Sequence, residues 1–292
     1  MCAFDVSRLE DDVRWLRDDT TLFNDHNFVR RREAFALLDF VQSHPEFPQN
    51  LRREARQLQD ELIALENNLF VDWRAILLSP ANRSHLLTLL SPFTAYQSGR
   101  WGKPHYGYED VDFLLDGVLT PPPHPSPIAH RERGMVRYQP TPASVIFELV
   151  ERLTLSSQRR FCDLGSGLGK VALLVNLLSG VLCLGIEFDP ALCAYARQRA
   201  ADLGLDGVHF VNTDARHADF GESEVFYLFN PFGGRIFHHV MARLHEVASH
   251  RPITICSYGA ATPVLSELPW LAPDALPVAD EYCVAIFRSQ IA

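Results

Sequence analysis

The chain has 292 residues, of which 47% are hydrophobic and 22% charged, and its formal net charge is −9. This composition is that of an ordinary globular protein, long enough for one large domain or two smaller ones. The acidic balance argues against a general nucleic-acid binder, which usually has a basic face, although it leaves room for a local basic patch. We therefore do not expect nucleic acid as a partner.

No run of about 18 apolar residues occurs, so the sequence predicts no membrane span. The segment Met1–Val6 has neither the basic start nor the apolar core of a secretory signal, and we expect a cytoplasmic protein. Six cysteines without a Cys-x-x-Cys pair are expected to be buried thiols. No acid or cysteine completes a metal site beside the histidines at 238, 239, 245 and 250, so no metal is predicted.

The first part of the chain, residues 5 to about 118, has the pattern of helices. Apolar residues spaced by three and four predict amphipathic helices over 51–65 and 28–40. The segment 73–90 is expected to be split at Ser79-Pro80, and 110–118 to form a short helix. Arg30-Arg31-Arg32 is expected on a solvated helix face. The aromatic and glycine-rich stretch 93–108 fits either a substrate lid or packing between domains.

Five prolines fall within the eight residues 120–127, which excludes helix and interior strand and predicts an extended linker. From about residue 135, apolar strands alternate with helices, a pattern typical of a parallel sheet. We therefore expect three regions, a helical N-terminal domain at 1–119, a proline-rich linker at 120–134 and an α/β domain at 135–292. The strands are expected at 160–164, 181–187, 208–212, 224–230, 252–258 and 281–288, with a further one near Leu276, and the helices at 143–153, 170–178, 191–203 and 234–248.

A glycine-rich turn, Asp163-Leu-Gly-Ser-Gly-Leu-Gly169, follows the strand 160–164 and precedes a helix. Such a turn lets a ligand approach the backbone and directs helix N–H groups at it. The glycines are spaced G-x-G-x-G, unlike the dinucleotide G-x-G-x-x-G, and Asp163 stands two residues before the first. That acid would repel a pyrophosphate and attract an ammonium group, as in S-adenosylmethionine.

Two further acids follow the next two strands. Glu187 ends its strand, where a carboxylate can accept both hydroxyls of a ribose, and Phe188 could lie against an adenine. Asp189-Pro190 is typical of a helix start. Asp214 follows the third strand, where it could accept the adenine amine while the N–H of Ala215 meets a ring nitrogen.

In this order and spacing, the three motifs resemble the class I (Rossmann-like) S-adenosylmethionine-dependent methyltransferases, over residues 135–292. The resemblance implies a mostly parallel seven-stranded sheet whose last strand is antiparallel. It implies S-adenosylmethionine as the cofactor, with the methionine part bound by Asp163, Gly165, Ser166, Gly167 and Gly169. Glu187 would then bind the ribose, and Phe188, Asp214 and Ala215 the adenine.

The fourth strand ends in Asn230-Pro231-Phe232, similar to the Asn-Pro-Pro-Tyr/Phe motif of amino and amide N-methyltransferases but one proline short. By that resemblance Asn230 would accept a hydrogen bond from the acceptor beside the cofactor, whereas Phe232 is displaced. Tyr138 and Thr141 precede the α/β core in a layout that resembles the non-SET histone lysine methyltransferases and their bacterial relatives. There the corresponding Tyr and Thr contact the cofactor, and helix capping is the alternative for Thr141.

Methyl transfer from a sulfonium needs mainly alignment and the exclusion of water, together with a proton acceptor for amine substrates. That proton acceptor could be Asn230, Tyr138 or a histidine of the helical half, which would also cap the pocket. We expect transfer to a nitrogen or oxygen of a small molecule or a protein side chain. The alternatives are a nicotinamide-dependent oxidoreductase and a non-catalytic cofactor-binding protein. Neither the acceptor nor the oligomeric state follows from the sequence.

Overall fold

The computed structural model describes residues 6–155, 159–275 and 281–290. Its centre is a seven-stranded sheet in the order β3-β2-β1-β4-β5-β7-β6. Only β7 runs antiparallel to its neighbours, which confirms the predicted α/β fold with an antiparallel last strand. The strands are β1 (Arg160–Leu164), β2 (Leu182–Glu187), β3 (Val208–Asn212), β4 (Val225–Phe229), β5 (Thr254–Tyr258), β6 (Leu271–Pro273) and β7 (Ala285–Ser289). The strand expected near Leu276 falls on a position outside the described residues, and β6 ends before it.

The helices follow the predicted order. They are α1 (Val6–Asp18), α2 (Phe28–Ser43), α3 (Gln49–Leu78), α4 (Leu86–Leu90), α5 (Asp110–Leu119), α6 (Ala143–Leu153), α7 (Lys170–Ser179), α8 (Pro190–Asp202), α9 (Gly234–His250) and α10 (Ala261–Ser266), with short 3₁₀ turns η1 (Thr20–Phe23), η2 (Pro80–His85) and η3 (Ser91–Phe93). The expected break at Ser79-Pro80 is present, and the helix before it is continuous with α3. Within the described ranges, no helix is both long and apolar enough to cross a bilayer.

Successive side chains of each strand face opposite sides of the sheet, so the strands serve two cores. In β4, Val225 and Tyr227 pack with α5 to α8, whereas Phe226 and Leu228 pack with α9 and α10. Both sets are completely buried, which explains why the strand reads as an unbroken apolar run. The cysteines at 162, 183 and 256 in these strands are buried as well, and so is the one at 193 in α8.

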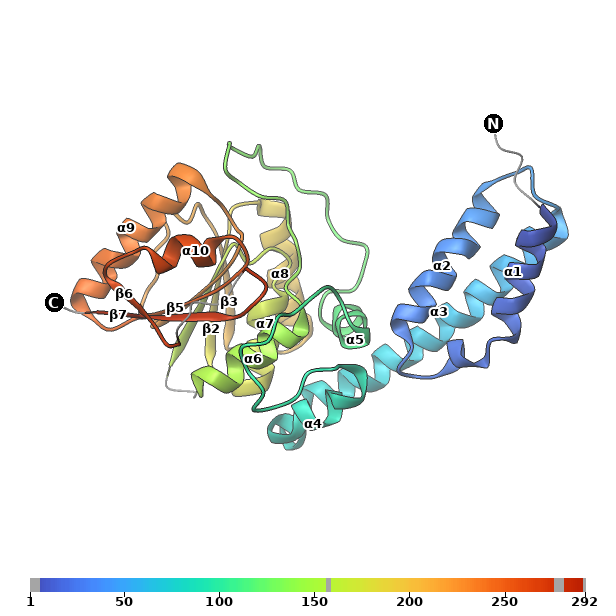
Figure 1. Ribbon diagram of the computed structural model, residues 1–292, viewed down its shortest axis with the longest axis horizontal. Coiled ribbons are helices and arrows are strands. Elements are labelled where there is room, and N and C mark those ends of the chain that lie inside the picture. Colours follow the sequence, from blue (N-terminus) through green and yellow to red (C-terminus); the bar gives the residue numbers. More distant parts are fainter. Residues whose placement is uncertain (1–5, 156–158, 276–280, 291–292) are drawn as a thin grey trace.

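Helices α1, α2 and α3 form a bundle that projects to one side of the sheet (Figure 1). The bundle has its own core, to which Leu38, Leu51, Leu58 and Leu62 contribute. The C-terminal part of α3 belongs instead to the core formed by α5 to α8 and the sheet, because Leu69 and Leu77 pack there beside α5 and α7. Apolar residues on both sides of position 120 therefore share one core.

Arg31 corrects the expectation of a solvated arginine face on α2. Its side chain is fully buried and its guanidinium donates to Glu66 of α3 at 2.9 Å and to the carbonyl of Leu22 at 3.0 Å. The helical period turns Arg31 toward α3, on the same side as Phe28 and Phe35. Charge alone gave no indication of this inward face.

The stretch 93–108 is fastened to α6 by two carboxylates. Glu151 accepts hydrogen bonds from Tyr96 at 2.8 Å and Trp101 at 3.1 Å, and Glu148 accepts from the backbone of Gly102 at 3.1 Å. Glu148 also meets His105 at 2.8 Å. These bonds favour packing over a lid for this stretch.

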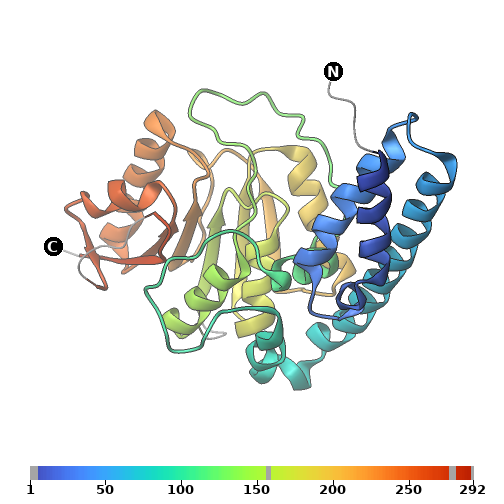
Figure 2. The ribbon, with the colours of Figure 1, turned by 45° about the vertical axis from the view of Figure 1, so that its right-hand side comes forward.

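The proline-rich segment is extended as predicted, and it crosses over the edge of the sheet where the parallel strands end (Figure 2). We call residues 120–137 the strap. Both oxygens of the Asp189 side chain are used: one caps α8, and the other accepts the N–H groups of Ile128 and Ala129 at 2.7 Å each. Further along, Gly233 donates to the carbonyl of Gly134 at 2.7 Å. The strap is thus held at its middle and near its C-terminal end against the α/β part.

Candidate functional site

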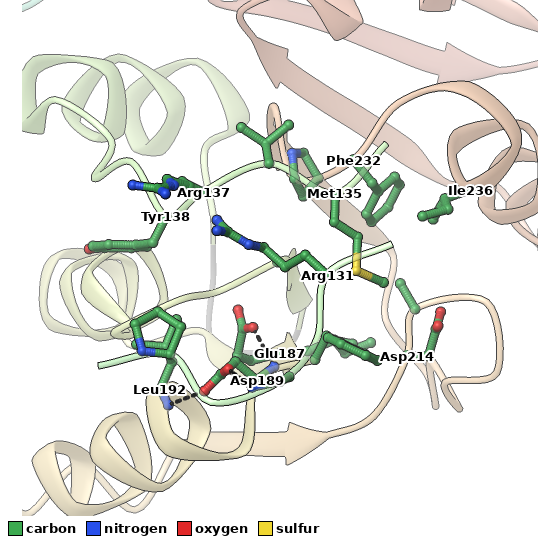
Figure 3. Close-up of a pocket in the computed structure, with 18 of the residues that line it drawn as sticks. Arg131, Met135, Arg137, Tyr138, Glu187, Asp189, Leu192, Asp214, Phe232 and Ile236 are labelled. Atoms are coloured by element: carbon green, nitrogen blue, oxygen red, sulfur yellow. Dashed lines mark hydrogen bonds between the residues drawn. The ribbon is translucent and has the colours of Figure 1, made fainter. Parts of the chain in front are cut away.

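The predicted site residues come from the carboxyl ends of neighbouring parallel strands, which meet at one edge of the sheet. Gly165 follows β1, Glu187 ends β2, Asp214 follows β3 and Asn230 follows β4. One cavity lies between these strand ends and the strap (Figure 3). Of the predicted site residues, it is lined by Tyr138, Gly165, Glu187, Phe188, Asp214, Ala215 and Asn230.

A second, smaller cavity opens on the other side of Gly165 and Tyr138. Its walls include three more predicted residues, Thr141, Asp163 and Ser166. Because Tyr138 and Gly165 line both cavities, the two form neighbouring compartments of one site. The structure thus brings together residues from five separate segments of the chain.

The glycine-rich turn adopts backbone angles that other residues avoid. Gly165 has φ of +85° and Gly167 has φ of +53°, in the left-handed region that glycine tolerates. A side chain on Gly167 would collide with the ring of Tyr138, which lies directly over it. Gly167 and Gly169 line neither cavity; Gly169 is the N-cap of α7 and packs against Phe210.

Glu187 is 9% exposed, and its carboxylate receives one hydrogen bond on each oxygen. The N–H of Gly167 donates to one at 2.7 Å and the N–H of Asp189 to the other at 2.8 Å. Burial raises the pKa of Glu187, against the lowering effect of these bonds. Each carboxylate oxygen can accept a further hydrogen bond, so the group suits a pair of ribose hydroxyls.

Asp163 is buried at the bottom of the smaller cavity and is 3% exposed. Burial, and then the charge of Glu187, raise the pKa of Asp163 to about 8. One of its oxygens and the hydroxyl of Ser166 are buried without a hydrogen-bond partner among the described residues. Because orphaned buried polar atoms are costly, this pair fits a ligand that brings a cationic donor such as an ammonium group.

Asp214 stands at the opposite end of the larger cavity. It holds Arg216 through a bidentate pair, with both oxygens 3.0 Å from Nε, and this hydrogen bonding lowers the pKa of Asp214. Arg216 also pairs with Glu132 of the strap at 2.9 Å. Phe188 and Ala215 line the same end. The carboxylate remains able to accept an additional amine hydrogen.

Asn230 occupies the strained position of the site. It is one of two non-glycine residues with positive φ in the described ranges, at +46°. The side-chain oxygen of Asn230 is buried without a hydrogen-bond partner among the described residues. Its amide presses against Gly259, where a side chain would collide with it. Asn230 lines both the larger cavity and a neighbouring groove between the strap and α9.

Tyr138 and Thr141 lie beside the glycine-rich turn. Thr141 is buried and its hydroxyl lies 3.4 Å from the hydroxyl of Tyr227. Within the described ranges, the N-cap of α6 is Pro142 and no side chain caps this helix. Burial strongly raises the pKa of Tyr138, so its phenol keeps its proton at neutral pH.

Three features of the site escaped sequence reasoning. The first is the strap itself, which supplies Arg131, Met135 and Arg137 to the cavity; Figure 3 shows Arg131 reaching across it above Glu187. No residue before Pro127 lines this cavity in the described ranges, so its cover comes from the strap. A run of prolines beside several arginines was the available signal.

The second feature is Lys170, the first residue of α7. Its buried ammonium lies 2.8 Å from Asp112 and 2.9 Å from Asp116, both of α5. These two carboxylates raise the pKa of Lys170 against the opposing effect of burial. The third feature is that Asp189 also holds the strap. The sequence predicted Asp189 only as the N-cap of a helix, which it is.

Comparisons with known proteins agree with the fold. Residues 135–227 match the family model of the histone methylation protein DOT1. The rRNA uracil-C5-methyltransferase RlmD of Shewanella sediminis is 37% identical over 71 residues, which is 24% of this chain and 16% of RlmD. The chain therefore spans only a small part of that relative's length.

Two solved structures illustrate the structural similarity. An RNA methyltransferase from Salinibacter ruber in complex with S-adenosyl-L-homocysteine has 25% identity and a TM-score of 0.39, over 52% of this chain and 94% of that one. Magnesium protoporphyrin IX methyltransferase from Synechocystis PCC 6803, with bound S-adenosylmethionine, has 15% identity and a TM-score of 0.39, over 51% and 77%.

The strand order, the three acidic strand ends and the family match agree on one assignment. The α/β part of this chain has the fold of the class I S-adenosylmethionine-dependent methyltransferases and matches the DOT1 family model over residues 135–227.

Proposed function

We propose that this chain binds S-adenosylmethionine across the two compartments and transfers its methyl group to a nitrogen or oxygen held beside Asn230. The observation that carries the proposal is the orphaned oxygen of Asn230, buried in a strained backbone at the point where the cofactor cavity meets an open groove. An N–H or O–H of the acceptor molecule would donate a hydrogen bond to the Asn230 oxygen. The lone pair on the acceptor's nitrogen or oxygen would then point into the cofactor cavity.

The chain's own residues divide the cofactor between them. Asp163 and Ser166 would receive the ammonium group, Glu187 the ribose hydroxyls, and Asp214 with the N–H of Ala215 the adenine. Phe188 would lie against the adenine face. When bound, the cofactor supplies a methyl carbon on a sulfonium, so that the acceptor's lone pair forms the new bond, the carbon–sulfur electron pair returns to sulfur, and the acceptor loses a proton.

The proton acceptor is narrowed by the geometry. Tyr138 is a poor base because burial keeps its phenol protonated, so we assign it to packing over the glycine-rich turn. His130 of the strap and His238 of α9 line the groove and are the histidines that we consider as proton acceptors. Histidines of the helical half line neither cavity nor groove among the described residues. A proton can also pass to water at the open mouth of the groove.

Nitrogen or oxygen acceptors fit better than carbon. An unactivated aromatic carbon needs covalent addition of a nucleophile such as a thiolate before it can accept a methyl group. No cysteine stands among the described residues that line the cavity or the groove. RlmD acts on a uracil carbon, and on this argument its chemistry does not transfer to the present chain.

Two substitutions test the proposal together. Glu187→Ala should weaken S-adenosylmethionine binding by about 1–3 kcal/mol, the usual cost of losing hydrogen bonds to a charged group, measured by titration calorimetry. Asn230→Ala should leave that affinity within about twofold and lower methyl transfer at least tenfold, measured with labelled cofactor and cell extract. Glu267→Gln, an exposed acid after α10, is the control. Unchanged affinity in Glu187→Ala would contradict the cofactor assignment, and equal losses in Asn230→Ala would make Asn230 structural.

The same measurements separate the alternatives. Binding of NADH in place of S-adenosylmethionine would favour an oxidoreductase, although the glycines are spaced G-x-G-x-G and not in the dinucleotide pattern G-x-G-x-x-G. Tight cofactor binding without transfer to any component of the extract would favour a non-catalytic protein. Fractionation of the extract into protein, nucleic acid and small molecules then shows which class of acceptor carries the labelled methyl group.

A further inference from the structure

A groove adjoins the cofactor cavity and shares Asn230 and Phe232 with it. Its cavity volume of about 1430 Å³ exceeds the 300–1,000 Å³ or so that is usual for small-molecule pockets. It runs between the strap and the first turn of α9.

The groove is cationic although the chain is acidic overall. Arg131 and Arg133 of the strap and Arg235 of α9 line it, all exposed, and their guanidinium groups form no ion pair or hydrogen bond with the described residues. Glu132 is the one carboxylate among the described lining residues, and Arg216 already neutralises it at 2.9 Å. The net charge of −9 therefore says little about the potential in this groove.

Helix α9 adds a second, independent attraction for anions. Its N-cap is Gly233, which provides no side-chain cap, and Gly233, Gly234 and Arg235 all line the groove. The free N–H groups of a helix's first turn, together with the helix dipole, form a binding place for phosphate. The helix has 17 residues, enough for a full dipole effect.

An aromatic and apolar floor completes the groove next to Asn230. Phe232 is half-buried and is joined by Ile236 and Met135, which Figure 3 places together on the side of the cavity away from Tyr138. An aromatic face beside exposed arginines is the combination that binds an unpaired base and the phosphates on either side of it. A small phosphate ester would use one cation, whereas these are spread over both walls.

We infer that the methyl acceptor is a single-stranded nucleic acid, with its phosphates on Arg133, Arg235 and the start of α9 and one base against Phe232 beside Asn230. This rests on the proposed function and departs from our expectation from net charge. That expectation averaged over the whole chain, whereas the acceptor meets only the groove.

The test uses the full chain saturated with S-adenosylhomocysteine and a fluorescent 12-nucleotide single-stranded RNA, followed by anisotropy. With about three phosphates neutralised, log Kd should depend on log salt concentration with a slope near 2, because each contact contributes about 0.7 for single strands. Arg133→Ala and Arg235→Ala should each weaken binding at least fivefold and reduce the slope by about 0.7. A DNA strand of the same sequence reports whether the sugar matters.

Controls separate this inference from the proposed function. Arg133 and Arg235 line the groove and not the cofactor cavity, so both variants should keep the wild-type affinity for S-adenosylmethionine. Arg53→Ala, an exposed arginine of α3, should change neither measurement. Normal cofactor binding with no RNA binding at micromolar protein would overturn the inference alone. So would equal affinity for adenosine monophosphate, which indicates a small acceptor, or tighter binding of a polyglutamate peptide. If the wild-type chain did not bind S-adenosylmethionine, the proposed function would be refuted instead.

Discussion

Two residues at the strand ends combine a binding function with an energetically unfavourable state. Asp163 must be buried to meet the amino-acid end of a ligand, yet burial disfavours its charge and raises its pKa to about 8. Asn230 must present an unsatisfied oxygen, and it does so from a left-handed backbone that a non-glycine residue seldom adopts. Unsatisfied groups of this kind in a well-packed protein are typical of binding sites.

The pKa of Asp163 leads to a pH prediction. Below about 8 the free protein holds this carboxyl mainly protonated, whereas an ammonium group requires the carboxylate. Cofactor binding should therefore release a proton, and affinity should rise between pH 5.5 and 7.5 by up to about tenfold per unit. Above that range the ligand's own amino group begins to lose its proton, near 8 for α-amino groups, which opposes the gain.

Calorimetry in two buffers of different ionisation enthalpy measures this proton directly. Asp163→Asn should bind more weakly and lose most of the pH dependence, because its amide does not titrate. If the wild type and Asp163→Asn had the same pH profile, the proton would have to come from another group, with Glu187 the first candidate because burial raises its pKa too.

At the scale of elements, one side chain connects the middle of the strap to α8. Asp189 caps α8 with one oxygen, which bonds the N–H groups of Ala191 at 2.9 Å and Leu192 at 3.2 Å, and holds the strap with the other. The strap in turn covers the cofactor cavity with Arg131, Met135 and Arg137. One residue thus connects the start of a helix to the cover of the site.

Asp189→Asn separates these two roles. Asparagine caps helices as well as aspartate does, so the free energy of unfolding should change by less than about 1 kcal/mol. Its one oxygen cannot serve both α8 and the strap, and its NH₂ group would oppose the N–H groups of Ile128 and Ala129. We expect faster amide exchange over 126–137 and faster dissociation of S-adenosylmethionine. Asp219→Asn, which alters an exposed turn, is the control. Unaltered exchange in the strap would show that other contacts hold it.

At the scale of the whole molecule, the helical part has two attachments. The helices α1 and α2 and the N-terminal part of α3 enclose their own core. In contrast, α5 and the C-terminal part of α3 belong to the larger core, which includes residues of the sheet. The buried ion pairs of Lys170 with Asp112 and Asp116 join α5 to the glycine-rich turn. The division that we proposed at residues 119 and 120 stays a prediction about folding units.

Leu38→Ala tests how separately the bundle behaves. Leu38 is fully buried in the bundle core, and its truncation should cost about 2–5 kcal/mol of local stability. We expect amide exchange to increase in α1 and α2 while cofactor affinity stays within about twofold. Ile63→Ala on the exposed face of α3 is the matched control, because Ile63 is 43% exposed. A parallel loss of cofactor affinity would mean that the bundle and the site are coupled.

Much of this architecture follows from the sequence alone, for local reasons. Apolar runs of strand length, clearest in β2 and β4, are typical of buried strands, and the positions of β1 to β5 were predicted to within two residues. The glycine-rich turn, Glu187, Asp214 and Asn230 were found because each directly follows a strand, and strand ends in such a sheet meet at one edge.

The tertiary structure decided what depends on contacts between distant segments. Arg31 is buried because Glu66 lies opposite it, and Lys170 because Asp112 and Asp116 do, pairings 35 residues apart or more that leave no local pattern. The proline-rich segment covers the cofactor cavity in part because Asp189 binds the backbone of Ile128 and Ala129. The cationic groove arises from the strap and α9, about 100 residues apart along the chain, so net charge gave no sign of it. Periodicity and short motifs report local geometry; ion pairs and grooves exist only once the chain has folded.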